Sequence, residues 1–289
     1  MIQDGFYDNI SITEYHADKT YFSSSSLKKA KKSLKLFKQY IDGLLDDDRK
    51  SHFDFGNAFE LALLDPETFK RDVLIYDAAA RPEKDKTITS KINQEWKNQV
   101  LATSKYVIKA DGKESYAAIE EMLRACYADA VIQKLIKNIE YQYSMFWTDP
   151  RTGLRLKSRP DVCKSKKNVI VDLKTTLDGS PEKFSKDLSN YDYPFQATMQ
   201  INGVIETGFM DKVDAYYWLV VEKEPPYSAT LYEFDADDRA YCQSEYEYVL
   251  HCVSEALQRG HFPSYSYRAD NKYGILRAAI PLWYKNFGM

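Results

Sequence analysis

The sequence contains few of the residues that build redox-active or transition-metal centres. Its 289 residues include four cysteines and four scattered histidines, and no two cysteines form a C-x-x-C pair. Zinc and iron–sulfur sites usually depend on closely spaced ligands of these types. The sequence therefore argues against both kinds of centre, and any metal bound by this chain would have to be held mainly by carboxylates.

Long apolar segments are also missing. No hydrophobic run approaches the roughly 20 residues that a membrane-spanning helix needs. The polar, acidic N-terminus has neither the charged nor the apolar region of a signal peptide. Hydrophobic residues make up 44% and charged residues 29% of the chain, which is typical of a folded globular protein and excludes a disordered one. We therefore expect a cytoplasmic protein without a membrane anchor.

The small net charge of −3 conceals a strongly basic segment. Residues 151–174 contain eight lysines and arginines but only two aspartates, a local excess of six positive charges. Such a segment can attract a polyanion even in a slightly acidic protein. A lysine-rich amphipathic helix predicted over 27–41, after the serines of 23–26, is a second candidate surface through Lys28, Lys32 and Lys35. A solvated helix face explains these lysines equally well.

Hydrophobic periodicity predicts alternating helical and extended segments. We expect helices over 55–64, 88–102, 112–137, 181–188, 194–209 and 237–259, and strands over 72–76, 139–147, 154–158, 169–175, 215–221 and 229–234. This order is typical of an α/β or α+β fold with a central mixed sheet flanked by helices. We predict one domain over 1–289, with an aromatic-rich tail of about 261–289 packing against its core.

Two aspartates and a lysine form the most informative pattern. Asp161 ends a predicted strand and Asp172 lies in the next one, so the polar turn at 164–168 predicts a hairpin that brings the carboxylates to one sheet edge. Lys174 shares a strand face with Asp172 because it lies two residues further on. Two carboxylates suit Mg²⁺ or Mn²⁺, and the lysine can orient a water or stabilise a phosphoryl group. An Asp-x-Lys sequence alone is more often an ordinary ion pair.

The pattern resembles the PD-(D/E)-x-K nuclease superfamily, and within it the RecE-like exonucleases of the exodeoxyribonuclease VIII type. The resemblance covers about residues 20–265 and implies a restriction-endonuclease-like core. Its motifs are weak singly and specific as an ordered set: Gly56-Asn57-Ala58-Phe59-Glu60, Arg159-Pro160-Asp161, Asp172-Leu173-Lys174 and Tyr193-x-x-Gln196.

The resemblance assigns roles to individual residues. It implies that the metal ligands are Asp161, Asp172, Glu60 and the carbonyl of Leu173, with Mg²⁺ as the cofactor and Mn²⁺ as a possible substitute. Lys174 would be the water-orienting base or the charge stabiliser, and Gln196 would support the site. Glu60 stands where relatives often have a histidine, and Gln200 where they have a tyrosine.

Several of these residues also have simpler interpretations. Glu60 could be a water-facing carboxylate, although its apolar neighbours indicate a buried helix on which an unpaired carboxylate would be costly. Gln196 and Gln200 could be exposed polar residues, and Arg159 could only pair with Asp161. The basic segment adds candidate DNA contacts at Arg155, Lys157 and Arg159, and Gln200 is a further candidate.

The activity implied by the resemblance is removal of nucleotides from one strand of linear double-stranded DNA, 5′→3′, by two-metal hydrolysis. The implied partners are DNA ends, a single-strand annealing recombinase and further copies of the chain in a ring. An endonuclease or repair nuclease of the same fold is the alternative enzyme. A catalytically silent DNA-binding module is the non-enzymatic alternative, which the retained Asp161, Asp172 and Lys174 disfavour.

Overall fold

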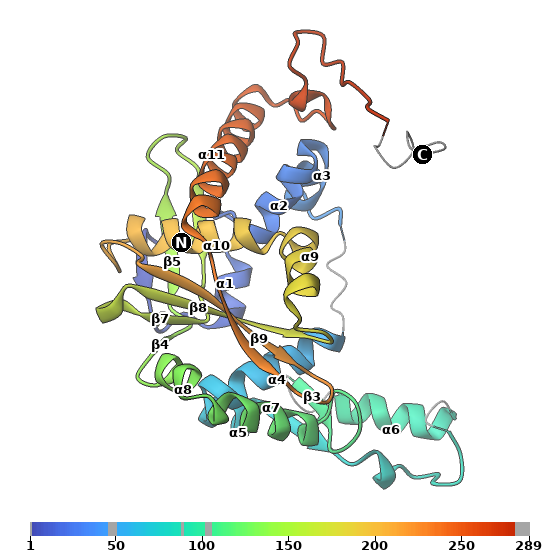
Figure 1. Cartoon of the computed structure of the whole chain (residues 1–289). Coiled ribbons are helices and arrows are strands. Elements are labelled where there is room, and N and C mark those ends of the chain that lie inside the picture. Colours follow the sequence, from blue (N-terminus) through green and yellow to red (C-terminus); the bar gives the residue numbers. More distant parts are fainter. Residues whose placement is uncertain (1, 46–50, 88–89, 102–105, 281–289) are drawn as a thin grey trace, which may run out of the picture.

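The centre of the computed structural model, which describes residues 2–45, 51–87, 90–101 and 106–280, is a mixed five-stranded sheet (Figure 1). Its strand order is β10-β9-β8-β7-β4. Strands β8 and β9 run parallel, and every other neighbouring pair is antiparallel. The strands are β4 (Glu140–Tyr141), β7 (Val162–Lys164), β8 (Val169–Thr176), β9 (Ala215–Glu222) and β10 (Ala229–Glu233).

Two smaller sheets accompany the central one. A three-stranded sheet has the order β1-β5-β6, and a parallel pair joins β2 to β3. Their strands are β1 (Gly5–Tyr7), β5 (Ser144–Thr148), β6 (Arg155–Ser158), β2 (Val73–Tyr76) and β3 (Tyr106–Lys109).

Helices cover both faces of the central sheet (Figure 1). On β9, Tyr216 and Trp218 pack into the core beneath the first group of helices, whereas Leu219 and Val221 pack into the core on the opposite face. The first group comprises α2 (Ser24–Lys32), α3 (Leu34–Ile41), α9 (Pro181–Tyr191), α10 (Tyr193–Glu206) and α11 (Ala236–Arg259). The second comprises α4 (Ser51–Leu64), α5 (Pro66–Asp72), α7 (Tyr116–Ala128) and α8 (Ala130–Ile136). The predicted mixed α/β class with a helix-flanked sheet is confirmed.

Two predicted helices are each divided by a capping residue. The helix predicted over 27–41 is two helices, because Ser33 is extended and its hydroxyl accepts a hydrogen bond from the Leu36 amide at 3.3 Å. The helix predicted over 112–137 is likewise α7 and α8, separated at Asp129, whose carboxylate caps α8. Periodicity alone continues across such positions, whereas a side-chain cap starts a new helix.

The strand prediction needs two corrections. The strand predicted over 139–147 is divided at Gln142, which has a left-handed backbone (φ 49°), so that β4 joins the central sheet and β5 the three-stranded one. The strand predicted over 154–158 is β6, which pairs with β5. The hairpin partner of β8 is the short β7, and the predicted turn at 164–168 connects these two strands.

The remaining segments are α1 (Ile12–Ala17), α6 (Lys91–Leu101) and the tail. Residues 88, 89 and 102 of the helix predicted over 88–102 lie outside the described residues, as do residues 281–289 of the tail. Phe262 and Tyr267 pack against the core, and the Tyr267 hydroxyl donates to the carbonyls of Ala30 and Lys31. None of the helices described is long and apolar enough to cross a membrane.

Candidate active site

The β7–β8 hairpin brings Asp161 and Asp172 together. Val162 of β7 pairs with Val171 of β8, so Asp161, the residue before β7, lies beside Asp172 at the same end of the ladder. The Leu173 amide donates a hydrogen bond of 2.7 Å to Asp161 Oδ2. The predicted hairpin thus brings the two carboxylates together, at one end of two interior strands, and Asp161 precedes a strand rather than ending one.

Asp172 is held from two directions. Its side chain is almost fully buried and forms an ion pair with Lys174, its neighbour on the same face of β8. The side-chain amides of Gln196 and Gln200, on one face of α10, each donate to Asp172 Oδ1 at 3.3 Å. Gln200 also accepts a hydrogen bond of 2.6 Å from the Tyr216 hydroxyl. Both glutamines therefore orient a site carboxylate and are not exposed polar residues.

A close contact beneath α10 sets how deeply this helix packs on the three-stranded sheet. Gly203 lies where the helix crosses the three-stranded sheet, and a Cβ added there would be 2.9 Å from a ring carbon of Trp147. Since real Cβ atoms essentially never approach so closely, only glycine allows the helix to pack at this depth. The close packing seats α10, the helix that carries Gln196 and Gln200, on β5 and β6.

Glu60 reaches the same site from α4, on the opposite face of the central sheet. Its Oε1 accepts hydrogen bonds from the Tyr141 hydroxyl at 3.2 Å and from the Gln142 side-chain amide at 2.6 Å. Its charge acts on Asp161, and that of Asp172 acts on Glu60. Glu60 therefore lies near enough to the two aspartates for their charges to interact.

The electrostatics reflect one buried carboxylate, that of Asp172, and two half-buried ones, those of Asp161 and Glu60, near one ammonium. Burial raises the pKa of Asp161 well above its usual value, and the charges of Glu60 and Asp172 raise it further. Burial also raises the pKa of Glu60, against hydrogen bonds from Gln142 and Tyr141 that lower it. For Lys174, burial lowers the pKa, but the carboxylates of Asp172 and Asp161 outweigh burial and raise it overall. The lysine is therefore an ammonium ion at neutral pH.

These carboxylates suit a divalent metal in charge and donor type. Hard oxygen ligands are those that Mg²⁺ and Mn²⁺ prefer, and a cation would relieve the repulsion that raises the two carboxyl pKa values. The hydrogen bonds of Glu60 and Asp161 each use only one carboxylate oxygen. Among the described residues, however, no three histidine, cysteine or acidic side chains are already gathered as metal ligands. The donors fit the metal, but they are bonded to protein groups here.

A first prediction tests this electrostatic crowding. Glu60→Gln keeps the acceptor oxygen for Tyr141 and Gln142 but removes one negative charge from the group. We therefore expect the free energy of unfolding of the metal-free protein to rise by about 1 kcal/mol or more at pH 8. The folded pKa of Glu60 is raised, so its contribution to stability is present below about pH 4.5 and is lost as pH rises through the folded pKa. The gain should therefore vanish near pH 4. The measurement is urea unfolding in EDTA at both pH values.

The exposed Glu120 of α7 provides the control for this prediction. Glu120→Gln removes one negative charge without removing a buried one, and should leave the free energy of unfolding within about 0.5 kcal/mol of wild type at both pH values. Equal effects of the two substitutions would contradict the electrostatic crowding.

A second effect of Glu60→Gln is expected on metal binding. The substitution should lower metal affinity roughly 10- to 100-fold, and excess Mn²⁺ should partly restore occupancy of the site.

The basic side chains of β6 point into the fold and hold the N-terminal segment. The Lys157 ammonium is buried and donates to the carbonyls of Tyr15 and Asp18 at 2.5 Å each. The Arg155 guanidinium donates to the Ile2 carbonyl at 3.1 Å. Because its ammonium is buried in these contacts, Lys157 is not accessible to a phosphate. The Arg155 guanidinium has a structural role in holding the N-terminal segment.

Arg159 links the N-terminal segment to the site. Its guanidinium donates to the Ile10 carbonyl at 2.8 Å, to the Ser144 hydroxyl at 2.8 Å and to the Gln142 side-chain oxygen at 3.0 Å. The predicted DNA contacts at Arg155, Lys157 and Arg159 are therefore disfavoured by the placement of these side chains. Gln200, the fourth, is buried against Asp172.

The structure adds residues to the site that the sequence pattern did not identify. Tyr141 and Gln142 lie in a segment that alternates as a plain strand, which gave no signal of their bonds to Glu60. Lys28 was identified only as one of several helix lysines. Its ammonium donates to the Tyr191 carbonyl at 2.8 Å, and burial lowers its pKa to about 8, with the charge of Lys174 acting in the same direction.

Comparison with protein families agrees with this geometry. Residues 23–272 match the family described as "PDDEXK-like domain of unknown function (DUF3799)". The chain belongs to this family. The resemblance to the PD-(D/E)-x-K superfamily inferred from the sequence is confirmed. A comparison with curated proteins finds no match.

Comparison with solved structures finds a likeness to the fold of this PDDEXK-like domain. The crystal structure named "Putative exonuclease" from Eubacterium rectale is 13% identical, with a TM-score of 0.60 over 97% of this chain and 99% of that chain. A phage-related exonuclease from Haemophilus somnus 129PT is 9% identical, with a TM-score of 0.32 over 65% of this chain and 96% of that chain. The first likeness extends the shared fold over nearly the whole chain.

Proposed function

We propose that this PDDEXK-like domain is a metal-dependent exodeoxyribonuclease that degrades one strand of linear double-stranded DNA. The observation that carries the proposal is the group formed by the buried Asp172 with the half-buried Asp161 and Lys174, with Glu60 approaching from the other face of the sheet. Such a group suits phosphodiester hydrolysis better than binding alone, because it buries like charges that a passive DNA-binding surface does not need. The name of the Eubacterium rectale protein supports the same class of activity.

In this proposal the protein's own residues position the reacting groups. Asp161, Asp172, Glu60 and the Leu173 carbonyl would hold Mg²⁺ or Mn²⁺, and Gln196 and Gln200 fix the orientation of Asp172. When bound, the metal would lower the pKa of a water molecule and neutralise charge on the phosphate. Lys174, which forms an ion pair with Asp172, would stabilise charge beside the scissile phosphate or orient the attacking water.

Further features of the proposal come from the resemblance to RecE-like exonucleases. They are 5′→3′ digestion, two metal ions in the reaction, a homo-oligomeric ring around DNA, and cooperation with a single-strand annealing recombinase. Arg155, Lys157 and Arg159 bind the N-terminal segment, which disfavours a path for DNA along these three side chains. The ring would therefore have to present other cations to the DNA.

The deciding experiment compares linear and covalently closed circular duplexes with and without Mg²⁺ or Mn²⁺. The proposal predicts loss of linear DNA alone, and only with metal, with a label at the 5′ end released before one at the 3′ end. Cleavage of the circle would establish the endonuclease alternative. Binding without cleavage of either substrate in both metals would establish the silent DNA-binding module.

A further prediction tests whether Lys28 contacts a phosphate of the bound DNA. Because its pKa is about 8, Lys28 carries a charge below that pH and loses it above. If the ammonium contacts a phosphate, DNA affinity should fall as pH rises through about 8, and Lys28→Ala should abolish this step. The substitution should also lessen the salt dependence of binding by about one unit of slope. The measurement is a salt titration of binding in Ca²⁺ at pH 7 and 9.

Lys35 is the matched control, since it is exposed on the neighbouring helix α3. Lys35→Ala should leave both the slope and the pH step unchanged. If the two variants behave alike, Lys28 makes no special phosphate contact and DNA must enter the site by another route.

A further inference from the structure

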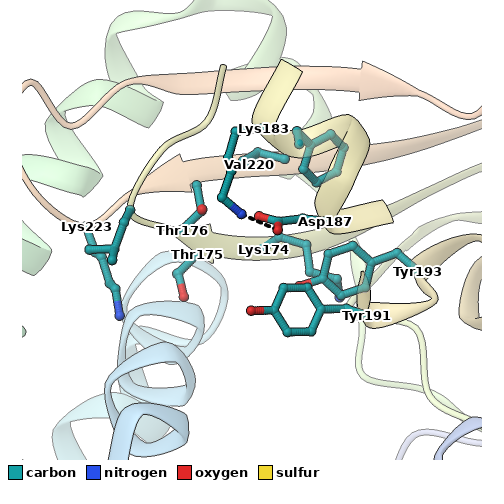
Figure 2. A pocket seen from close by; sticks show the side chains of 11 residues that line it. Lys174, Thr175, Thr176, Lys183, Asp187, Tyr191, Tyr193, Val220 and Lys223 are labelled. Carbon is teal, nitrogen blue, oxygen red and sulfur yellow. Dashed lines mark hydrogen bonds and ion pairs between the residues drawn. The ribbon is translucent and has the colours of Figure 1, made fainter. Parts of the chain in front are cut away.

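A pocket of about 220 Å³ lies directly beside the site lysine. Lys174 forms part of its wall together with its strand neighbours Thr175 and Thr176, while Phe184, Tyr191 and Tyr193 close it from α9 and α10 (Figure 2). The pocket is therefore continuous with the group of residues proposed to cleave the phosphodiester bond. A ligand bound in it would contact Lys174.

Two tyrosines in this pocket lie against each other. The rings of Tyr191 and Tyr193 are stacked, with centroids 5.4 Å apart and planes at 25° (Figure 2). Tyr193 is also anchored by Lys174, whose ammonium lies 4.7 Å from the centre of its ring. Tyr191, the last residue of α9, is 58% exposed. The inner ring is thus fixed beside the site lysine, and the outer ring presents an aromatic surface to solvent.

The size of the pocket limits the kind of ligand that it can hold. Its wall contains three lysines, at 174, 183 and 223, and one carboxylate, Asp187, which pairs with Lys183. Lys223 lies across the pocket from the tyrosines and pairs with Glu114 (Figure 2). Lys174 pairs with Asp172, so each lysine of the wall has a carboxylate partner and the charges of the wall largely balance. The volume is smaller than the roughly 300–1,000 Å³ of common small-molecule sites, so it suits one flat ring system and not a base pair.

We propose that Tyr191, supported by Tyr193, is a stacking platform for one unpaired nucleobase of the strand whose phosphate lies at Lys174. This inference rests on the proposed function, because it takes DNA as the substrate. An aromatic ring accepts any base through its π face, so the platform favours a single-stranded end without selecting a sequence. The terminal base pair of a duplex must then open before the strand is cut, since a paired base cannot lie on the ring.

The first test uses fluorescence of the base itself. The probe is a 5′-phosphorylated single-stranded oligothymidylate with one 2-aminopurine, placed at the 5′ or the 3′ end in separate molecules and bound in Ca²⁺. Wild type and Tyr191→Phe should quench one of the two probes by stacking. Tyr191→Leu, which keeps an apolar side chain but has no ring, should not quench it and should bind about 5- to 100-fold more weakly.

Tyr241 of α11 is the matched control because it is 71% exposed. Tyr241→Leu should bind and quench like wild type. Circular dichroism melting should show that Tyr191→Leu keeps its fold, as expected for an exposed side chain. Quenching by Tyr191→Leu equal to that of wild type would overturn the platform.

The second test removes the base instead of the ring. An abasic nucleotide at the quenched position should weaken binding by wild type as much as Tyr191→Leu does, and should have little further effect on that variant. Equal sensitivity of both proteins to the abasic nucleotide would overturn the inference. If wild type cleaves no DNA but quenches through Tyr191, the proposed function fails and the platform stands. If it cleaves linear DNA and Tyr191→Leu still quenches, the platform alone fails.

Discussion

Asp172→Asn is expected to reduce DNA cleavage by a factor on the order of a thousand or more, because it removes a central metal-ligand charge while leaving the side chain's size unchanged. The buried Asp172 lies between Lys174 and the two glutamines of α10, so no other described carboxylate has the same set of contacts. The measurement is single-turnover digestion of linear duplex in Mg²⁺ and Mn²⁺. Asp161→Asn should give a comparable loss, and its side-chain oxygen can still accept the Leu173 amide.

Asp149 provides the control for the loss of a buried aspartate. Its side chain is also buried, but its carboxylate binds the amide and hydroxyl of Thr152 in the turn before β6. Asp149→Asn is expected to lower stability without a comparable loss of turnover. Asp172→Asn with turnover near that of wild type would refute the assignment of the site.

Lys174→Gln should have the second large effect, because it should lower both DNA cleavage and the stability of the metal-free protein. Cleavage should fall about 10²- to 10⁴-fold, because the ammonium no longer stabilises charge at the phosphate. The metal-free protein should also lose about 3 kcal/mol of stability near pH 8, since Asp172 is left as an unpaired buried charge. Urea unfolding in EDTA measures the second effect independently of catalysis.

The double variant Asp172→Asn, Lys174→Gln separates the two effects. It removes both charges, so stability in EDTA should return close to that of wild type while cleavage stays abolished. A double variant as unstable as Lys174→Gln alone would mean that the lysine's packing against Tyr193, and not its ion pair, stabilises the fold.

The parts of the site that the sequence predicted depend on local geometry. Asp172 and Lys174 share a strand face because side chains alternate along a strand, and Gln196 and Gln200 share a helix face because they are one turn apart. Asp161 joins them through a hairpin whose polar turn is visible in the sequence. Glu60 was predicted through the family motif and its apolar neighbours, which indicated a buried carboxylate in need of a partner.

The parts that the sequence could not predict depend on distant segments. Lys157 is separated by well over a hundred positions from Tyr15 and Asp18, whose carbonyls it binds, and a basic residue in sequence looks the same whether it faces a phosphate or the chain's own backbone. The left-handed residue Gln142 divides a strand without interrupting its alternation, and only the fold shows that its amide reaches Glu60.

The contacts of Arg159 have a consequence for the amino-terminal segment. The Ile10 carbonyl, the Arg159 guanidinium, the Gln142 side chain and Glu60 form one continuous series of hydrogen bonds. The amino-terminal segment is therefore connected through hydrogen bonds to Glu60 of α4. A change that displaces residues near Ile10 would therefore also disturb the hydrogen bonds of Glu60.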